Sequence, residues 1–541
     1  MTDNMVYKSR QQIFSKSVFY SLIALILAAG WGVRLIGLKY SVFAYNYRRG
    51  DEPAAYEKAL HYSRAQLKIK NNLPLDDAEK KSQYQSSALL GKGGVLPGPL
   101  QNMIIARGMK ITGNIEGAHI LILVMHCLSI ILCWHIAYLL FGQVISLLTV
   151  IMASFFFWPV YYSFGMWHPH FIPLVAVLTA WPLACHLKTD KTFWLMPAAF
   201  FFTLFFQFHL IGSFLIFFLV FYFICFIDKK NQAAVAILTG ITLALAMFYR
   251  NYLSFEFSTG FSNLRGLFAH GLFHIEVLKI FSNCIVVGSA EISRIIDGGF
   301  PAYREFYSRY MISFFLAAPF ILLSLLLPLL AYIHILRETF LTLAGKKIKH
   351  WKEIIKNRKE LFFLSGWFFI PWMIYLLRLK YHELRFVALD FPVMYAMFAI
   401  YIVQLSDKFL TKKTYLLFAV IVCFNTAVTF FSLEWGLYVL KKPPHMIFSL
   451  RYYDNIAWKI INDLEKNGKT DYYIEFNRSA YSQKLNWFYD GIIEHIERTG
   501  AGRYVYADEA SSIYRISSSS LINNYSCLGS IYSVYLLKKN E

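Results

Sequence analysis

The chain has 541 residues, of which 57% are hydrophobic and only 16% are charged, and its mean hydropathy is +0.44. Soluble globular domains carry about 25% charged residues, so this composition excludes a soluble domain and an intrinsically disordered chain. The formal net charge of +20 is carried by residues between the apolar segments, which favours loops that face anionic lipid over a nucleic-acid-binding surface.

Apolar segments of about 20 residues recur along the chain, and each is long enough to cross a hydrocarbon core about 30 Å thick. They do not alternate polar and apolar residues as the strands of an outer-membrane barrel do. The segment 193–227 is split near Gly212, because one helix of that length would be about 50 Å long. About eleven transmembrane helices are therefore predicted, at 18–37, 118–141, 144–165, 170–187, 193–208, 210–227, 233–253, 311–336, 361–379, 386–405 and 414–438.

The distribution of Lys and Arg sets the expected orientation. With the N-terminus in the cytoplasm, each short basic loop falls on the cytoplasmic side, as the positive-inside rule requires. These loops are 188–191, 229–230, 346–359 and 408–413. The long segments 39–116 and 254–310 then lie on the extracytoplasmic face, where their basic residues weigh little because long loops cross largely regardless of charge.

The chain is expected to have two parts. Its composition changes after Pro443 and Pro444, where two helical patterns ending at Gly468 and Gly500 alternate with segments typical of strands. The predicted strands are DYYIEF, RYVYAD, SIYRIS and IYSVYLL. We therefore predict an all-α polytopic membrane region over residues 1–440, with a large first external loop, and a small extracytoplasmic α/β domain over residues 441–541.

The seven cysteines are scattered, and most lie in apolar segments, where each behaves as a small hydrophobic residue. Their spacing fits neither a disulfide framework nor a metal site. His168 and His170, which flank Pro169, lack a third nearby ligand that would make them a metal pattern.

An acidic pair, Asp51 and Glu52, opens the first external segment. Pro53 suits the first position of a helix, and the apolar residues that follow have helical spacing, so Asp51 is expected at the N-cap. On its own the pair fits a helix cap better than a catalytic site. The helix dipole also favours the ionised carboxylate, however, and an ionised carboxylate at a membrane surface suits a general base.

Three further clusters are expected on the same face: Gly91–Leu100, Trp167–His170 and Gln207–His209. The first is too rich in Gly and Pro for a helix or a strand, and is predicted to be a turn whose N–H groups can approach a phosphate. Its spacing is not that of a Walker loop, so a plain connector is the simpler interpretation. The other two clusters fit an aromatic belt and a helix end in the headgroup layer.

A short external loop after the ninth span carries Arg378, Lys380 and Arg385. Loops on this face are not expected to be enriched in cations, so this group predicts an anionic ligand. Asp390 follows about one turn inside the membrane, where an ionisable residue is a functional candidate, although an ion pair with Arg385 explains it equally well. Glu434 and Arg250 are expected at the same face.

Taken in order, these residues resemble the polyprenyl-phosphate-sugar-dependent branch of the GT-C glycosyltransferases, which includes protein O-mannosyltransferases and the aminoarabinose transferases that act on lipid A. The similar motifs are Asp51-Glu52, Pro97-Gly98-Pro99-Leu100, Trp167-His168-Pro169-His170, Phe208-His209-Leu210, and Arg385-Phe386 followed by Asp390-Phe391-Pro392. The resemblance covers residues 15–440. Histidines replace the asparagines of the family's Trp-Asn-Pro-Asn pattern, which weakens the transfer of roles to His168 and His170.

The resemblance implies an inverting transfer of a sugar from a polyprenyl phosphate to an acceptor hydroxyl of an envelope glycan, lipid or protein. Asp51 would be the base, with Glu52 sharing or orienting that role, and Arg378, Lys380 and Arg385 would bind the donor phosphate. His168, His170, His209 and Asp390 would contact substrate. No cofactor is required, a divalent cation is compatible, and no nucleic acid is expected as a partner. The implied location is a bacterial inner membrane, with a cytoplasmic N-terminus and a periplasmic C-terminal domain.

Three alternatives are weighed against this function. A transporter or flippase for a lipid-linked glycan should show inverted repeats and polar groups near the membrane midplane, whereas the polar clusters here lie at one edge. An O-antigen polymerase or ligase also places arginines in external loops, but the early Asp51-Glu52 pair and the Pro-Gly-Pro-Leu turn argue against it. A structural scaffold explains the spans and leaves the one-sided clustering unexplained.

Overall fold

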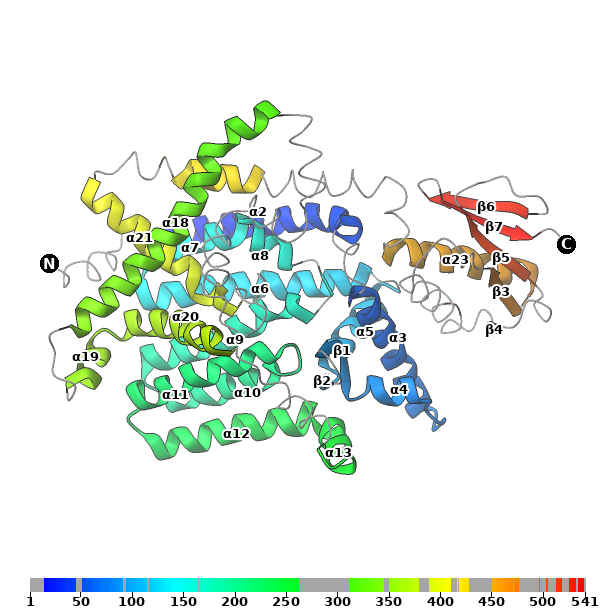
Figure 1. Ribbon diagram of the computed structural model, residues 1–541, viewed down its shortest axis with the longest axis horizontal. Helices are drawn as coiled ribbons and strands as arrows, with labels where there is room; N and C mark the ends of the chain where they lie inside the picture. The colour runs from blue at the N-terminus through cyan, green and yellow to red at the C-terminus, as the bar shows by residue number, and fades with distance from the viewer. Residues whose placement is uncertain are drawn as a thin grey trace.

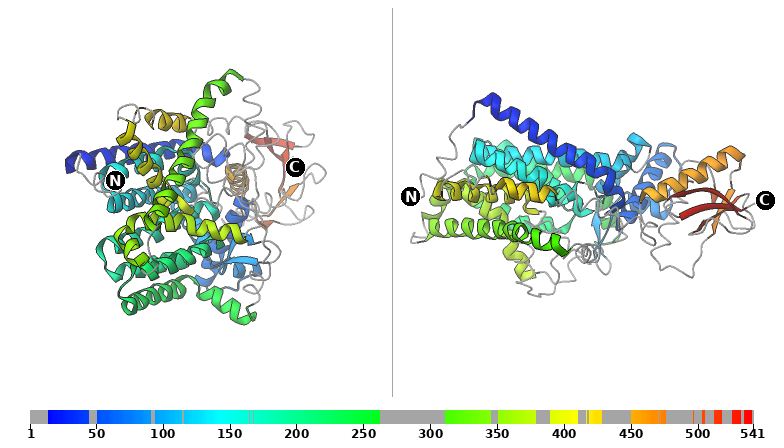
Figure 2. Two further views of the ribbon diagram at one scale, coloured as in Figure 1. Left: turned by 60° about the vertical axis from the view of Figure 1, so that its left-hand side comes forward. Right: turned by 90° about the horizontal axis from the view of Figure 1, so that it is seen from above.

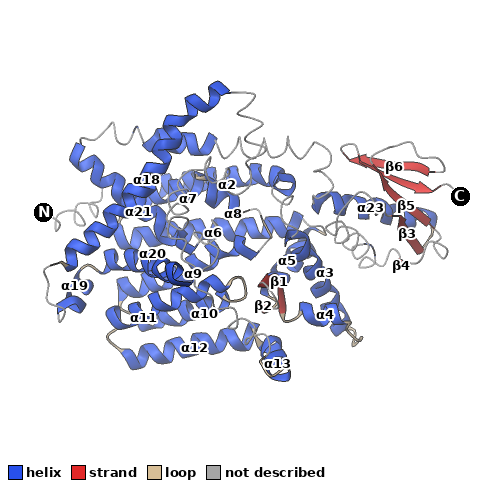
Figure 3. Cartoon of the chain, viewed as in Figure 1, coloured by secondary structure: helices blue, strands red, loops and turns tan. Residues whose placement is uncertain are grey.

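The computed structural model describes residues 14–44, 51–90, 94–113, 116–163, 165–166, 168–261, 311–344, 350–378, 389–409, 416, 418–427, 450–469, 471–475, 496, 503–504, 512–517, 525–531 and 534–539. These residues are predominantly helical, and their strands lie in two small sheets (Figure 3). The helices of the first half are α2 (Lys16–Ala44), α3 (Asp51–Lys70), α4 (Asp77–Ser82), α5 (Leu100–Thr112), α6 (Glu116–Phe141), α7 (Gln143–Phe155), α8 (Phe157–Tyr162), η1 (His168–Phe171), α9 (Ile172–Thr189), η2 (Thr192–Trp194), α10 (Leu195–Phe205), η3 (Leu210–Phe214), α11 (Leu215–Phe226), α12 (Lys230–Phe248) and α13 (Arg250–Ser258). The later helices are α18 (Met311–Leu343), α19 (Trp351–Asn357), α20 (Lys359–Arg378), α21 (Phe391–Phe409) and α23 (Leu450–Asn467).

Helical residues are found at each position where the sequence predicts a membrane span. Five helical segments among the described residues are long and apolar enough to cross a membrane: Lys16–Ile36, Glu116–Phe141, His168–Thr189, Lys230–Phe248 and Leu326–Leu343. Several other apolar helices have only 10–17 residues. Two of the predicted spans are shortened by breaks within the described residues. The helix expected over 144–165 breaks at Phe156, and the break expected near Gly212 begins earlier, after Phe205.

The apolar helices pack side by side into a bundle (Figure 1). The helix α6 lies near the middle and contacts α7 and α9, while α2 packs on α6 and α7 from one side. On the other side α10 packs between α9 and α12. The helix α21 contacts α7, α9 and α18, and α20 contacts α11. The two further views in Figure 2 show the same parallel arrangement of long helices.

The elements outside the bundle gather at its two ends (Figure 1). The helices α3, α4, α5, α13 and α23 and all of the labelled strands lie toward the right-hand end, and α19 lies at the left-hand end. This grouping agrees with the sequence-based expectation that segments 39–116 and 441–541 share one side while the basic loop that contains α19 lies on the other.

The first external segment folds into α3, α4, a hairpin and α5. The hairpin pairs β1 (Gln85–Leu90) with β2 (Gly94–Pro97) in antiparallel register, with Leu90 opposite Gly94. The prediction that the whole of Gly91–Leu100 is a turn is therefore wrong for residues 94–97. The pairing tolerates Pro97, which has no N–H to donate, because Pro97 lies at the end of an edge strand. The helix α3 packs on both α5 and β1.

The C-terminal part of the chain after residue 440, called the tail below, contains a mixed sheet with α23 beside it. The strands are β3 (Asp471–Glu475), β4 (Arg503–Tyr504), β5 (Ser512–Ser517), β6 (Tyr525–Ile531) and β7 (Val534–Lys539), in the order β4-β3-β5-β7-β6. The strand β3 runs parallel to β4 and β5, whereas β7 runs antiparallel to β5 and β6. The predicted strand IYSVYLL instead spans the end of β6 and the start of β7, where Ile531 pairs with Val534 on the antiparallel neighbour. Of the predicted helix ending at Gly500, only Ile496 is among the described residues.

Asp463 joins α23 to this sheet. Its Oδ2 accepts hydrogen bonds from the hydroxyl of Tyr514 at 2.7 Å and lies 2.9 Å from Nζ of Lys538. Tyr514 and Lys538 are themselves opposite one another on β5 and β7. Burial acts to raise the pKa of the Asp463 carboxyl, but the hydrogen bonds from Lys538 and Tyr514 outweigh burial and hold that pKa below its ordinary value.

Replacing Asp463 with Asn should therefore destabilise the tail. A hydrogen bond to a charged group contributes about 1.5–3 kcal/mol, and the wild-type contribution should disappear as the pH falls from about 4 through the lowered pKa of the folded state. Thermal unfolding of the full chain between pH 3 and pH 7 measures this loss. Glu465→Gln, an exposed change on the same helix, is the matched control, and equal unfolding of both variants at pH 7 would contradict the assignment.

Candidate functional site

A cavity of about 530 Å³ lies where α3 and α5 meet the end of α12. Its polar walls come from distant parts of the sequence. They are Tyr62 and Gln66 of α3, Gln83 of the turn after α4, Arg107 of α5, and Arg250 and Asn251 of α13. Pro99, Met103, Met247 and Phe248 supply apolar surface.

The two arginines give this cavity its positive charge. The side chains of Arg107 and Arg250 are exposed, and neither forms an ion pair with an acidic residue in the described part of the chain. Burial raises the pKa of the Tyr62 phenol, while the nearby Arg107 acts in the opposite direction. Gln66 donates from Nε2 to Oε1 of Gln83 at 2.7 Å, which fixes the opposite wall. The cavity therefore offers two cations and several hydrogen-bonding groups to an anionic ligand.

The hairpin and α13 hold the rim of the cavity. The ring of Tyr84 stacks on Phe255 of α13, with centroids 4.4 Å apart. The N–H of Gly98 donates to the carbonyl oxygen of Tyr84 at 2.8 Å. The turn that precedes α5 is thus tied to the hairpin on one side, and the hairpin is tied to α13 on the other.

The predicted acidic pair lies at the start of α3. The helix begins at Asp51, two residues before the position expected from Pro53. Proline is tolerated anywhere in a first turn, because the first four N–H groups of a helix have no partner within the helix. The structure describes the backbone of Asp51 and Glu52 but not their side chains. Buried residues Ala55, Tyr56 and Ala59 anchor this first part of α3.

The predicted phosphate ligands lie largely outside the described residues. Arg378 is the last residue of α20, and its side chain is not described. Lys380 and Arg385 belong to the segment 379–388, which lies outside the described residues. The cavity arginine Arg107 was not singled out from the sequence, because a single cation in an amphipathic helix looks like an ordinary surface residue.

The structure brings two of the three candidate histidines together. The rings of His168, in η1, and His209, at the N-cap of η3, lie 5.2 Å apart between centroids, and both side chains are buried. Nδ1 of His209 accepts a hydrogen bond from the N–H of Ile211 at 3.0 Å. His170 points elsewhere, because its Nδ1 lies 3.2 Å from the N–H of Gly165. Its carbonyl oxygen lies 2.8 Å from Nε2 of His126.

Asp390 is buried and held by tryptophans of α20. Nε1 of Trp372 donates to Oδ2 of Asp390 at 2.7 Å, and Nε1 of Trp367 donates to the carbonyl oxygen of Leu389 at 3.1 Å. Oδ1 of Asp390 has no hydrogen-bond partner in the structure as described. These contacts fix the start of α21 against α20. The expected pair with Arg385 involves a residue outside the described ranges.

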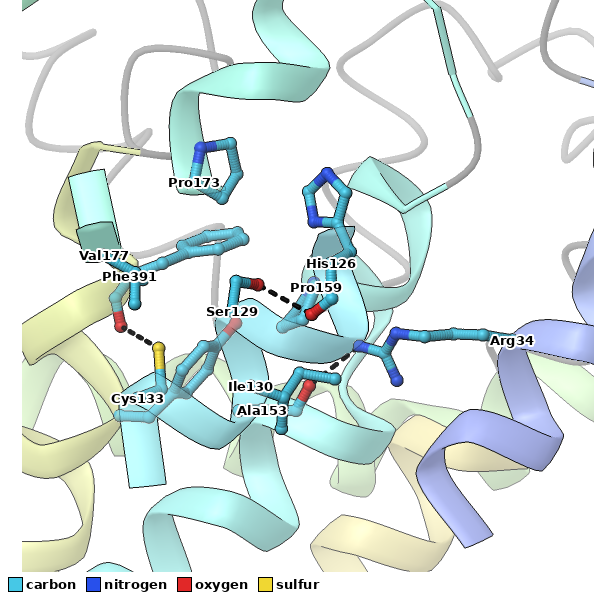
Figure 4. A pocket seen from close by; sticks show the side chains of 11 residues that line it. Arg34, His126, Ser129, Ile130, Cys133, Ala153, Pro159, Pro173, Val177 and Phe391 are labelled. Carbon is cyan, nitrogen blue, oxygen red and sulfur yellow. Dashed lines mark hydrogen bonds between the residues drawn. The ribbon is translucent and has the colours of Figure 1, made fainter. Parts of the chain in front are cut away.

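Arg34 is a fully buried cation within the bundle (Figure 4). Its guanidinium donates to the carbonyl oxygens of Ser154 at 2.7 Å, Ala153 at 2.9 Å and Gly30 at 3.0 Å. Ala153 and Ser154 belong to the last turn of α7, whose carbonyl groups have no partner once the helix breaks at Phe156. Arg34 therefore caps the C-terminus of α7, where the helix dipole favours a positive charge. An arginine within a predicted span was visible in the sequence, but its partners were not.

Replacing Arg34 with Met should destabilise the bundle, because it leaves the two α7 carbonyl groups buried and unpaired. Each buried polar group left without a hydrogen bond costs about 1–3 kcal/mol. The thermal midpoint of the purified protein in detergent is expected to fall. The midpoint of Arg34→Lys should fall less, because a lysine can still donate a hydrogen bond to these carbonyl groups. An unchanged midpoint in Arg34→Met would contradict the capping role.

Among the described residues, no group of three or more His, Cys, Asp and Glu side chains is arranged to hold a metal ion. The arginines and hydrogen-bonding side chains of the cavity are groups that can bind an anion and hydroxyl groups. A cavity at the end of an apolar helix presents that chemistry at the membrane boundary.

One family model matches part of this chain. Residues 97–252 match the family described as dolichyl-phosphate-mannose-protein mannosyltransferase, and this segment contains Arg107 and Arg250. The search of curated proteins finds no match.

Several solved structures are similar over nearly the whole chain. ArnT from Cupriavidus metallidurans bound to undecaprenyl phosphate aligns with a TM-score of 0.51 and 10% identity, covering 97% of this chain and 98% of that protein. The apo state of the same protein aligns with a TM-score of 0.47 and 10% identity, over 94% of this chain and 98% of that protein. The oligosaccharyltransferase AglB from Archaeoglobus fulgidus, in complex with an inhibitory peptide and a dolichol-phosphate, aligns with a TM-score of 0.42 and 13% identity, over 92% of this chain and 65% of that protein.

The match to ArnT extends from end to end of both chains, so the predicted polytopic helical architecture is confirmed at the level of the fold. The low identity transfers no individual site residue. The chain has the GT-C fold, which it shares with ArnT from Cupriavidus metallidurans.

Proposed function

We propose that the chain is an integral-membrane glycosyltransferase that moves a sugar from a polyprenyl-phosphate donor to an acceptor hydroxyl on the extracytoplasmic face. The observation that carries the proposal is the cavity at the end of α12, whose two arginines have no acidic partner among the described residues. A phosphate linked to one lipid and one sugar carries a negative charge and needs cations at the membrane boundary.

The lipid part of such a donor has a matching surface. The helix α12 exposes Val235, Leu238, Leu243 and Met247, and it is apolar enough to span a membrane. Met247 also lines the cavity, so the exposed apolar face of α12 leads directly to the arginines. An isoprenoid chain can lie along this face while its phosphate enters the cavity.

The comparisons support a lipid-phosphate donor. The family that matches residues 97–252 is described by a dolichyl-phosphate sugar, and ArnT from Cupriavidus metallidurans was solved with undecaprenyl phosphate. The proposal extends to this chain the kind of ligand named for those proteins. We also propose that the protein lies in a bacterial inner membrane, with α3, α5 and the C-terminal sheet outside the cytoplasm.

The proposed reaction is a single displacement. The acceptor oxygen forms a bond to the anomeric carbon, the bond from that carbon to the phosphate oxygen breaks with its electron pair, and the acceptor proton passes to Asp51. Polyprenyl phosphate leaves, and the anomeric configuration inverts. Asp51 begins the helix that supplies Tyr62 to the cavity, about 16 Å earlier along its axis. The anomeric carbon is bonded directly to a phosphate oxygen, so the transfer requires the donor phosphate to lie on the side of the cavity nearest the start of α3, within reach of the Asp51 carboxylate.

Other candidate residues keep the roles proposed for them. Glu52 shares or orients the base function. Arg378, Lys380 and Arg385 add positive charge that stabilises the departing phosphate, and His168, His170, His209 and Asp390 contact substrate or position the residues that do. The transfer as written requires no cofactor, and a divalent cation remains compatible with it.

Asp51→Asn should abolish transfer while the protein still folds, because the amide cannot accept the acceptor proton. Removing a positioned base slows a reaction by about 10²–10⁴. The measurement is release of free polyprenyl phosphate from a polyprenyl-phosphate sugar by purified protein and acceptor. Full activity of the variant would contradict the base assignment, and a wild type that binds the donor without converting it would favour a transporter.

Arg107→Met and Arg250→Met should each weaken donor binding. One hydrogen bond to a charged group contributes about 1.5–3 kcal/mol, so the KM for the donor should rise about tenfold or more in each variant. Lys110→Met is the matched control, because Lys110 is an exposed cation on α5 that does not line the cavity. Donor affinity that is unchanged in both arginine variants would place the phosphate elsewhere.

A further inference from the structure

The side chain of Gln207 is completely buried in the turn between α10 and η3. Its Oε1 accepts a hydrogen bond from the N–H of Leu100 at 3.1 Å, and its Nε2 donates to the carbonyl oxygen of Phe248 at 3.0 Å. Leu100 is the first residue of α5, and Phe248 is the last residue of α12. One amide therefore joins two helix ends that are far apart in the sequence.

Each of these helix ends has a backbone group that needs a hydrogen-bond partner, and the Gln207 amide supplies it. The first N–H groups of a helix lack an acceptor, and its last carbonyl groups lack a donor. A carboxamide is the side-chain group that offers an acceptor and a donor together at fixed separation. Glu at this position could satisfy only Leu100 when ionised, and Met could satisfy neither helix.

The turn before α5 is fitted to this amide. Gly98 has a φ of +92°, which side chains other than glycine rarely adopt. A Cβ at this position would also lie 2.2 Å from Cδ of Gln207. The Pro97–Leu100 turn and Gln207 thus require one another, which gives the Gly-Pro cluster a structural role beyond that of a connector.

The two helices that Gln207 joins carry the cavity arginines. Arg107 lies seven residues after Leu100 on α5, and Arg250 lies two residues after Phe248. Pro99 and Phe248, which flank the two hydrogen bonds, also line the cavity. We infer that Gln207 is a positioning residue that sets the separation of Arg107 and Arg250, and hence the affinity of the cavity for a lipid-linked phosphate. This inference rests on the proposed function of that cavity.

Undecaprenyl phosphate binding to the purified full chain tests this role. Gln207→Met should raise the Kd about tenfold, because two hydrogen bonds that fix the walls are lost. Gln207→Glu should raise the Kd at pH 8, and the defect relative to wild type should shrink at pH 5.5, because a protonated carboxyl can again donate to Phe248. A purely structural role would lower the yield of folded protein without this pH-dependent recovery of affinity.

Gln143→Met is the matched control. Gln143 is also a buried amide that hydrogen-bonds both backbone groups of a single residue, Phe14, at 3.2 Å and 3.3 Å. It begins α7 and does not line the cavity. Its variant should therefore leave the Kd unchanged. A Kd in Gln207→Met equal to that of wild type, or an equal rise in Gln143→Met, would overturn the positioning role.

A second measurement separates this inference from the proposed function. In a background without other cysteines, Met103→Cys places a thiol on the cavity wall. Its rate of reaction with a water-soluble thiol reagent measures how accessible that position of the wall is. Adding Gln207→Met should change that rate severalfold, and adding Gln143→Met should not. If wild type fails to bind undecaprenyl phosphate, the proposed function fails while the labelling still decides the role of Gln207. Identical labelling rates would overturn it.

Discussion

A helix that ends or breaks within a membrane leaves N–H and C=O groups that no water can satisfy, so other parts of the protein must bind them. This chain meets that requirement with long polar side chains from distant helices. Arg34 binds the carbonyl groups at the end of α7, Gln207 joins the ends of α5 and α12, and Trp367 binds the backbone before α21. Each of these buried side chains holds backbone groups at a helix end, and Gln207 does so beside the arginine cavity.

The location of the arginine cavity follows from these constraints. The helix α12 ends at Phe248, whose carbonyl is held by Gln207, and the chain then turns into α13 with Arg250 at its first position. Because α5 is fixed to the same amide, Arg107 approaches from the other side. The result is a pair of cations without acidic partners in the described structure, next to an exposed apolar helix. That combination suits a phosphate attached to a long hydrocarbon better than it suits a soluble anion.

Much of the fold follows from hydrophobic length and the positions of Lys and Arg, because the hydrocarbon thickness is the same for every span. The sequence also indicates the strands of the tail and the helix that starts at the acidic pair. It does not reveal the role of Arg107, the contacts of Gln207 or the partners of Arg34, because these depend on contacts between residues more than 100 positions apart. The interruption of the predicted 144–165 helix at Phe156 was missed for the same reason, since the capping arginine that stabilises it comes from α2. His168 and His209 were identified singly, and their contact emerged only from the structure.

The most direct test of this account is an experimental structure of the full chain with undecaprenyl phosphate bound. The account predicts that the phosphate lies between Arg107 and Arg250, with the isoprenoid along the exposed face of α12. The phosphate oxygen to which the sugar is attached in the donor should face the start of α3. A phosphate bound at the opposite end of the bundle, beside α19, would contradict it.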